Sequence, residues 1–117
     1  MPTPTRGDRL VHILEAIKGV ANYLADKTFD DYRREPMLRD AVERRIERIS
    51  EASRHVPDEM KAAAPQIPWR AIAAIGNILR YDYDGVRSDE VWRIAKRDLP
   101  ALKAAVEAIL QALPDDG

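Results

Sequence analysis

The chain has 117 residues, of which 45% are hydrophobic and 33% charged, which is typical of one helix-rich globular domain spanning residues 1–117. Nineteen Lys and Arg against twenty Asp and Glu give a net charge of -1, so nucleic-acid binding would need a local basic patch. The absence of cysteine excludes disulfides and thiolate zinc sites. Because no apolar signal core or membrane-length segment is evident, we expect a cytoplasmic protein without membrane attachment.

Helical periodicity and proline positions divide the chain into segments, and nothing in it has the pattern of a strand. The predicted helices span 7–26, 29–36, 37–56, 57–65, 68–81, 89–98 and 99–113. Asp8 is the expected N-cap of the first, Ser88 or Asp89 of the sixth, and Asp98 of the last, which Pro100 bends or restarts. The predicted fold is all-α, an antiparallel up-and-down bundle of four to five principal helices.

Two helices carry clear apolar stripes. In the first these are Leu10, Ile13, Leu14, Ile17, Val20, Ala21 and Leu24, and in the third Leu38, Val42, Ile46, Ile49, Ala52 and Val56. The opposite face of the third helix, "RRIERISEASR", could contact phosphates, but its interleaved glutamates favour a solvated surface. The run "AIAAIG" predicts a close helix contact, which Ala74→Arg is expected to disturb. Gly76 strengthens this prediction, because glycine costs a helix interior about 1 kcal/mol relative to alanine.

Metal and histidine chemistry have weak support. His12 is interpreted as a surface or boundary residue, and His55 as a helix C-terminal residue favoured by the helix dipole. Asp82 and Asp84 could suggest a divalent cation, yet they lack the further oxygen ligands of a calcium loop, and solvated acids at a helix end are the better interpretation. We therefore expect no metal and no cofactor.

Several segments, taken in order, resemble the HepT-like proteins of the HEPN superfamily. They are "DRLVHILEAI", "FDDYRREPMLRDAVERRIERISEASRHVPDEM", "PQIPWRAIAAIGN" and "VWRIAKRDLPALKAAVEAIL". The resemblance implies an HEPN-like helical bundle that pairs as a homodimer and acts as a metal-independent ribonuclease toxin. It also implies a minimal nucleotidyltransferase (MNT-type) antitoxin as partner, and RNA as a possible ligand.

The family motif is an arginine, four to six residues, then histidine, any residue and tyrosine. Its histidine transfers protons and its arginine holds a phosphate. The resemblance places Gly76 at the arginine and Tyr81 at the histidine, whereas Asn77 and Tyr83 match. Both principal catalytic side chains are therefore replaced.

Two functions remain open. In the first, a ribonuclease toxin persists with Arg80, Tyr81, Tyr83 and Asn77 as its candidate catalytic residues. In the second, the protein is a catalytically silent dimeric binding protein that keeps only partner, nucleotide or RNA binding. In either case the resemblance implies that the antitoxin could transfer AMP to Tyr83.

Overall fold

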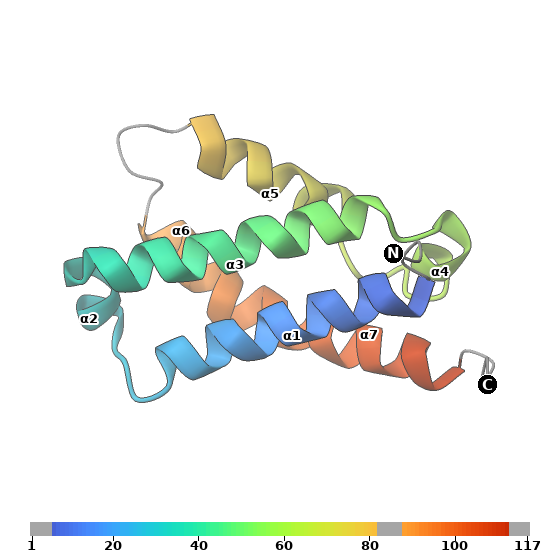
Figure 1. The fold of residues 1–117 in the computed structure, drawn as a ribbon, viewed down its shortest axis with the longest axis horizontal. Coiled ribbons are helices and arrows are strands. Elements are labelled where there is room, and N and C mark those ends of the chain that lie inside the picture. The colour runs from blue at the N-terminus through green and yellow to red at the C-terminus, as the bar shows by residue number, and fades with distance from the viewer. Residues whose placement is uncertain (1–5, 82–87, 113–117) are drawn as a thin grey trace, which may run out of the picture.

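The computed structural model describes residues 6–81 and 88–112, and these residues form helices without any strand (Figure 1). The elements are α1 (Arg6–Leu24), α2 (Phe29–Arg34), α3 (Pro36–Arg54), α4 (Asp58–Ala62), α5 (Trp69–Tyr81), α6 (Ser88–Arg93), a π-helical turn η1 (Ile94–Asp98) and α7 (Leu99–Ala112). The predicted all-α class is confirmed, and each predicted helix has a counterpart.

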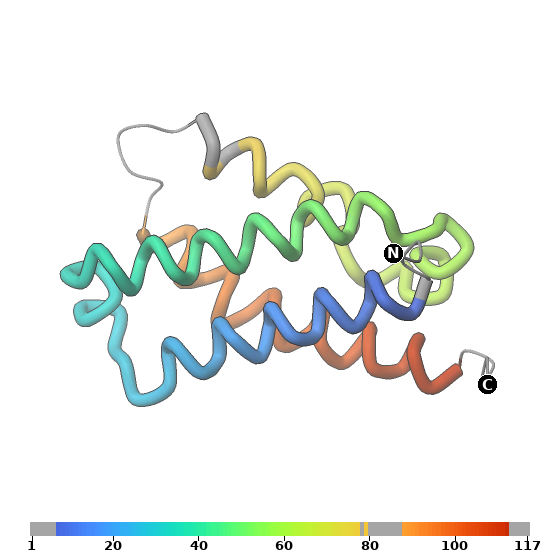
Figure 2. The backbone as a smooth tube through the Cα atoms, viewed as in Figure 1, coloured from blue at the N-terminus to red at the C-terminus, as the bar shows by residue number. Residues whose placement is uncertain are grey.

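The four longest helices lie in an antiparallel series. α1 and α3 run side by side, α7 packs against α1, and α5 lies on the other side of α3 (Figure 1). The short helices α2 and α6 contact each other near the beginning of α3 (Figure 2). α5 packs chiefly on α3, so its orientation depends on that one contact.

The core forms where the predicted stripes meet. Leu10, Ile13 and Val20 of α1 are almost completely buried, as are Val42 and Ile46 of α3. α7 adds the buried residues Leu102, Val106 and Ile109. The stripes are confirmed except at their edges, where Ala21 is exposed and Leu14 and Leu38 are half-buried. Within the described residues, no helix is both long and apolar enough to cross a membrane.

The ends of α2 and α3 follow from local sequence. Thr28 and Asp31 form a capping box at the start of α2, with reciprocal hydrogen bonds of 2.9 and 3.1 Å. The hydrogen bonds from Thr28 lower the pKa of Asp31. Pro36 then occupies the first turn of α3, where its missing N–H has no intrahelical partner to lose. His55 follows the last residue of α3, as predicted, and its ring lies 3.3 Å from Glu51.

Two predicted caps are wrong. Asp8 lies inside the first turn of α1, because the helix already includes Arg6. Asp98 does not cap a separate helix, because α6, η1 and α7 follow one another without a break. The Leu99 N–H bonds to the Ile94 carbonyl, five residues back. This wider turn accommodates the ring of Pro100, which would clash with a carbonyl in a regular α-helix.

Glu43, near the beginning of α3, makes the folding stability depend on pH. Its half-buried position raises its pKa through desolvation, and the charge of Asp40 adds to the effect. A raised folded-state pKa favours folding at low pH, and this contribution is lost as the pH rises above the ordinary glutamate range.

We therefore expect Glu43→Gln to raise the Tm at pH 7, with the gain shrinking as the pH falls towards about 4. Thermal unfolding at both pH values measures the effect, and Glu107→Gln, on an exposed face of α7, is the control. An equal Tm change at both pH values would contradict the burial argument.

Candidate functional site

Ser50 of α3 joins the two helices that form the candidate site. Its hydroxyl is buried, donates to the Ala73 carbonyl at 2.8 Å and accepts from the Gly76 N–H at 3.1 Å. One side chain therefore bonds to two backbone groups of α5. Ser50 lies outside the predicted apolar stripe of α3, and its spacing in the sequence gives no sign of this role.

Gly76 faces this hydroxyl at very short range. A Cβ added at Gly76 would lie 2.9 Å from Ser50 Oγ and 3.3 Å from Ser50 Cβ. The predicted close contact of α5 is thus confirmed at Gly76, which is buried. Ala74, in the same alanine run, is exposed and takes no part in it. A side chain at position 76, which aligns with the motif arginine, would therefore be directed at α3 and would require Ser50 to move.

Arg54, also on α3, lies beside the same turn of α5. Its Nε and Nη2 donate to the Ala73 carbonyl at 3.2 and 2.8 Å, and its Nη1 donates to Glu51 at 3.2 Å. Nη2 is also 3.7 Å from the position that a Gly76 Cβ would take. Its nitrogens are thus occupied by the carbonyl and the carboxylate. Arg54 therefore fixes α5 in place.

Three of the four predicted catalytic residues lie in the second half of α5. Asn77 is exposed on the helix, and Arg80 and Tyr81 are its last two residues. Tyr83 and the acids Asp82 and Asp84 lie outside the described residues. Within the described ranges, no three His, Asp or Glu side chains are arranged to hold a metal ion.

Trp69 fixes the beginning of α5. Its ring is 8% exposed, and its Nε1 donates to the Ala64 carbonyl at 3.1 Å and to the Lys61 carbonyl at 3.2 Å. The first turn of α5 is thereby tied to α4 and the segment after it. Together with Ser50 and Arg54, Trp69 sets the position of the helix that carries Asn77, Arg80 and Tyr81.

Comparison with known proteins shows which family the chain belongs to. A family model described as "Ribonuclease HepT-like" matches residues 13–109. "Gamma-glutamylcyclotransferase and putative RNase" of Methanocaldococcus jannaschii is 40% identical over 104 residues, which cover 89% of this chain but only 47% of that protein. "Probable ribonuclease HepT" of Thermococcus cleftensis is 34% identical over 102 residues, covering 87% of this chain and 93% of that protein.

A second protein of Methanocaldococcus jannaschii, named "Putative RNase", is 33% identical over 100 residues, covering 86% of this chain and 92% of that protein. No solved structure matches. The family model covers most of the chain, from the middle of α1 to near the end of α7, and so includes both helices of the site. The chain therefore belongs to the HepT-like ribonuclease family.

Proposed function

We propose that this chain is the HepT-type component of a toxin–antitoxin pair, and that it binds RNA on a ribonuclease scaffold whose active-site motif is degenerate and silent. The observation that carries the proposal is Gly76. It stands at the motif arginine position, and its neighbour Ser50 Oγ would be 2.9 Å from any Cβ there. The chain has the scaffold of the family, and the close packing of α5 on α3 depends on the absence of that side chain.

The chemistry of RNA cleavage explains why this replacement matters. Cleavage without a metal needs a group that moves protons near neutral pH and a cation that stabilises the developing phosphate charge. Tyr81 has replaced the histidine, and an ordinary tyrosine has a pKa of about 10, which makes it a poor base at neutral pH. Arg54 is near but is bonded to Ala73 and Glu51. Both catalytic functions are therefore weakened together.

The proposal includes two protein partners. A second copy of the chain would pair two α5 segments in one cleft, and a strict monomer in sedimentation at micromolar concentration would contradict this. An MNT-type nucleotidyltransferase would act as antitoxin and transfer AMP to Tyr83. Mass spectrometry after incubation with such an enzyme and ATP tests the transfer, with Tyr83→Phe as the control.

A second candidate is a working ribonuclease that uses Arg80, Tyr81, Tyr83 and Asn77. It is favoured by the names of the similar proteins, each of which contains the word RNase or ribonuclease. The exposed position of Asn77 on α5 also fits a residue that contacts RNA.

An RNA-cleavage assay separates the two candidates. We expect no cleavage by the wild type and measurable cleavage by the triple variant Ser50→Ala, Gly76→Arg and Tyr81→His. Ser50→Ala is included because it removes the hydroxyl that obstructs a side chain at position 76. The matched control carries Tyr81→Phe in place of Tyr81→His and should stay inactive. If the wild type cleaves RNA and Tyr83→Phe does not, the protein is a working ribonuclease and the proposal of a silent active site is wrong.

A further inference from the structure

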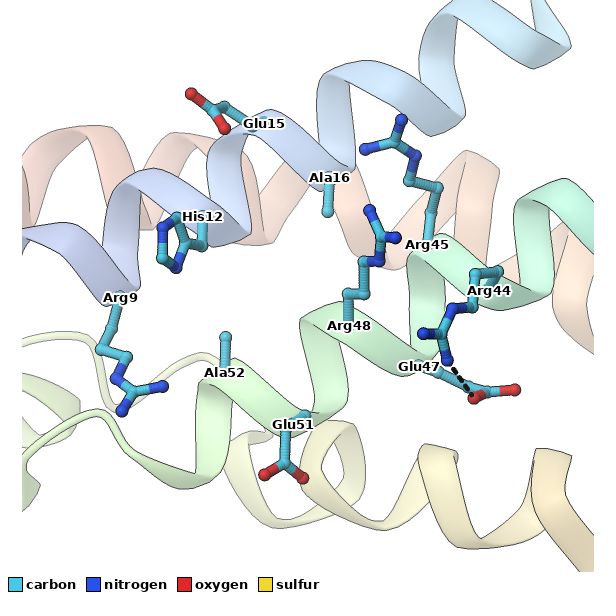
Figure 3. A pocket seen from close by; sticks show the side chains of 10 residues that line it. All are labelled: Arg9, His12, Glu15, Ala16, Arg44, Arg45, Glu47, Arg48, Glu51 and Ala52. Atoms are coloured by element: carbon cyan, nitrogen blue, oxygen red, sulfur yellow. Dashed lines mark ion pairs between the residues drawn. The ribbon is translucent and has the colours of Figure 1, made fainter. Parts of the chain in front are cut away.

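A charged groove lies between α1 and α3, apart from the Ser50 contact of α5. Its volume is about 450 Å³, and Figure 3 shows the side chains that line it. They are Arg9, His12, Glu15, Ala16, Arg44, Arg45, Glu47, Arg48, Glu51 and Ala52. Ala16 and Ala52 are buried and small, so the two helices leave a hollow between longer polar side chains.

The acids of the groove are largely turned away or paired. Glu47 pairs with Arg44 at 3.6 Å, and Glu51 pairs with Arg54 at 3.2 Å outside the groove. Glu15 points away from α3 in Figure 3.

The remaining cations point inward. Arg9 extends from α1 towards α3, and Arg48 extends from α3 towards α1 (Figure 3). Neither arginine has a hydrogen bond or ion pair with another residue in the described ranges. The interior of the groove is thus more positive than its four arginines and three glutamates suggest.

Arg45 is held in place before any ligand binds. Its Nη2 lies 3.3 Å from the Tyr23 hydroxyl, and its guanidinium carbon lies 5.7 Å from the centre of the Tyr23 ring. Gly19 makes this possible, because a Cβ there would be 3.1 Å from Arg45 Nε. A guanidinium fixed in this way keeps N–H groups for a phosphate and loses less freedom on binding.

We propose that this α1–α3 groove binds the phosphodiester backbone of single-stranded RNA through Arg9, Arg45 and Arg48. The inference rests on the proposed RNA binding of the chain and adds a site separate from the α5 motif. Guanidiniums from two helices provide a positive track of the kind that follows a nucleic-acid backbone. Because contacts to phosphate carry no sequence information, binding through these three arginines is independent of base sequence.

Fluorescence anisotropy with a labelled single-stranded RNA oligonucleotide tests the groove at several salt concentrations. We expect Arg9→Gln/Arg48→Gln to weaken binding about tenfold and to lower the slope of log K against log salt by about 1.4, the value for two lost phosphate contacts. The control Arg33→Gln/Arg34→Gln removes the same charge from α2, where both arginines pair with Asp30, and should bind within about twofold of the wild type. Equal circular dichroism and Tm would show that both variants are folded.

Each other outcome has a distinct meaning. If the groove variant binds RNA as tightly as the wild type, the groove is not the binding site, although the chain still binds RNA. An equal loss of affinity in the α2 control leads to the same conclusion. No RNA binding by the wild type overturns both the groove and the proposed function. Displacement of the RNA by polyglutamate at equal charge concentration would show a site for acidic protein segments and would also overturn the inference. Cleavage of RNA by the wild type would contradict only the proposed loss of catalytic activity and would not affect the inferred RNA-binding groove.

Discussion

Replacing Gly76 with alanine is expected to lower the free energy of unfolding by about 2 kcal/mol, although alanine is the better helix former. Helix propensity alone would stabilise the variant by about 1 kcal/mol. The new methyl group would lie 2.9 Å from Ser50 Oγ, so either the serine rotates or α5 moves away. Rotation breaks the bonds to both Ala73 and Gly76 and leaves a buried hydroxyl unpaired, which outweighs the gain in propensity.

Urea unfolding of four proteins tests this explanation: the wild type, Gly76→Ala, Ser50→Ala and the double variant. With Ser50 already replaced by alanine, Gly76→Ala should cost less than about 1 kcal/mol, because only the Cβ at 3.3 Å still opposes the new methyl. Additive effects of the two substitutions would show that the hydroxyl is not the obstacle. Stabilisation by Gly76→Ala in the wild-type background would remove the steric reason for glycine at this position.

The sequence predicts most of this fold, because its helices are amphipathic and interrupted by prolines. Leu10, Ile13 and Ile46 could be assigned to the core from spacing alone, since one face of each helix must be buried. The caps were harder to predict. Asp98 is a residue type that often caps helices, but α6 and α7 continue through the π-helical turn η1. Spacing along one helix carries no information about that turn.

The candidate site was predictable only in part. Gly76 indicated a close contact, but the partner could not be named, because Ser50 and Arg54 are ordinary polar residues until α3 is placed beside α5. The glutamates between the arginines of α3 suggested a solvated face. The prediction is confirmed, since Arg44, Arg48 and Glu51 are exposed. Spacing could not show that Glu47 and Glu51 pair with other arginines, while Arg48 points towards α1. The direction of side chains across two helices is a tertiary property that one helix cannot reveal.

Trp69 connects the family resemblance to the mechanics of the site. The sequence "IPWRAIAAIGN" carries part of the resemblance, and the structure shows a mechanical role for its tryptophan. The Trp69 ring is buried, and its Nε1 bonds to the carbonyls of Ala64 and Lys61. Since α5 otherwise packs chiefly on α3, the ring and the Ser50 contact together determine where the end of α5 lies. Loss of the ring should therefore release α5 before the rest of the bundle.

We expect Trp69→Ala to lower the free energy of unfolding by about 4 kcal/mol, which is a large part of the stability of a domain of this size. Trp69→Phe keeps most of the apolar surface and loses only the indole N–H, so it should cost about 1–2 kcal/mol and remain folded. Hydrogen exchange on Trp69→Phe should then show faster exchange in α5, with α1 and its core contacts little changed. Equal acceleration in α1 and α5 would show that Trp69 supports the whole core. In that case the conformation of the candidate site would depend on global stability, and α5 could not be repositioned independently by an RNA or protein partner.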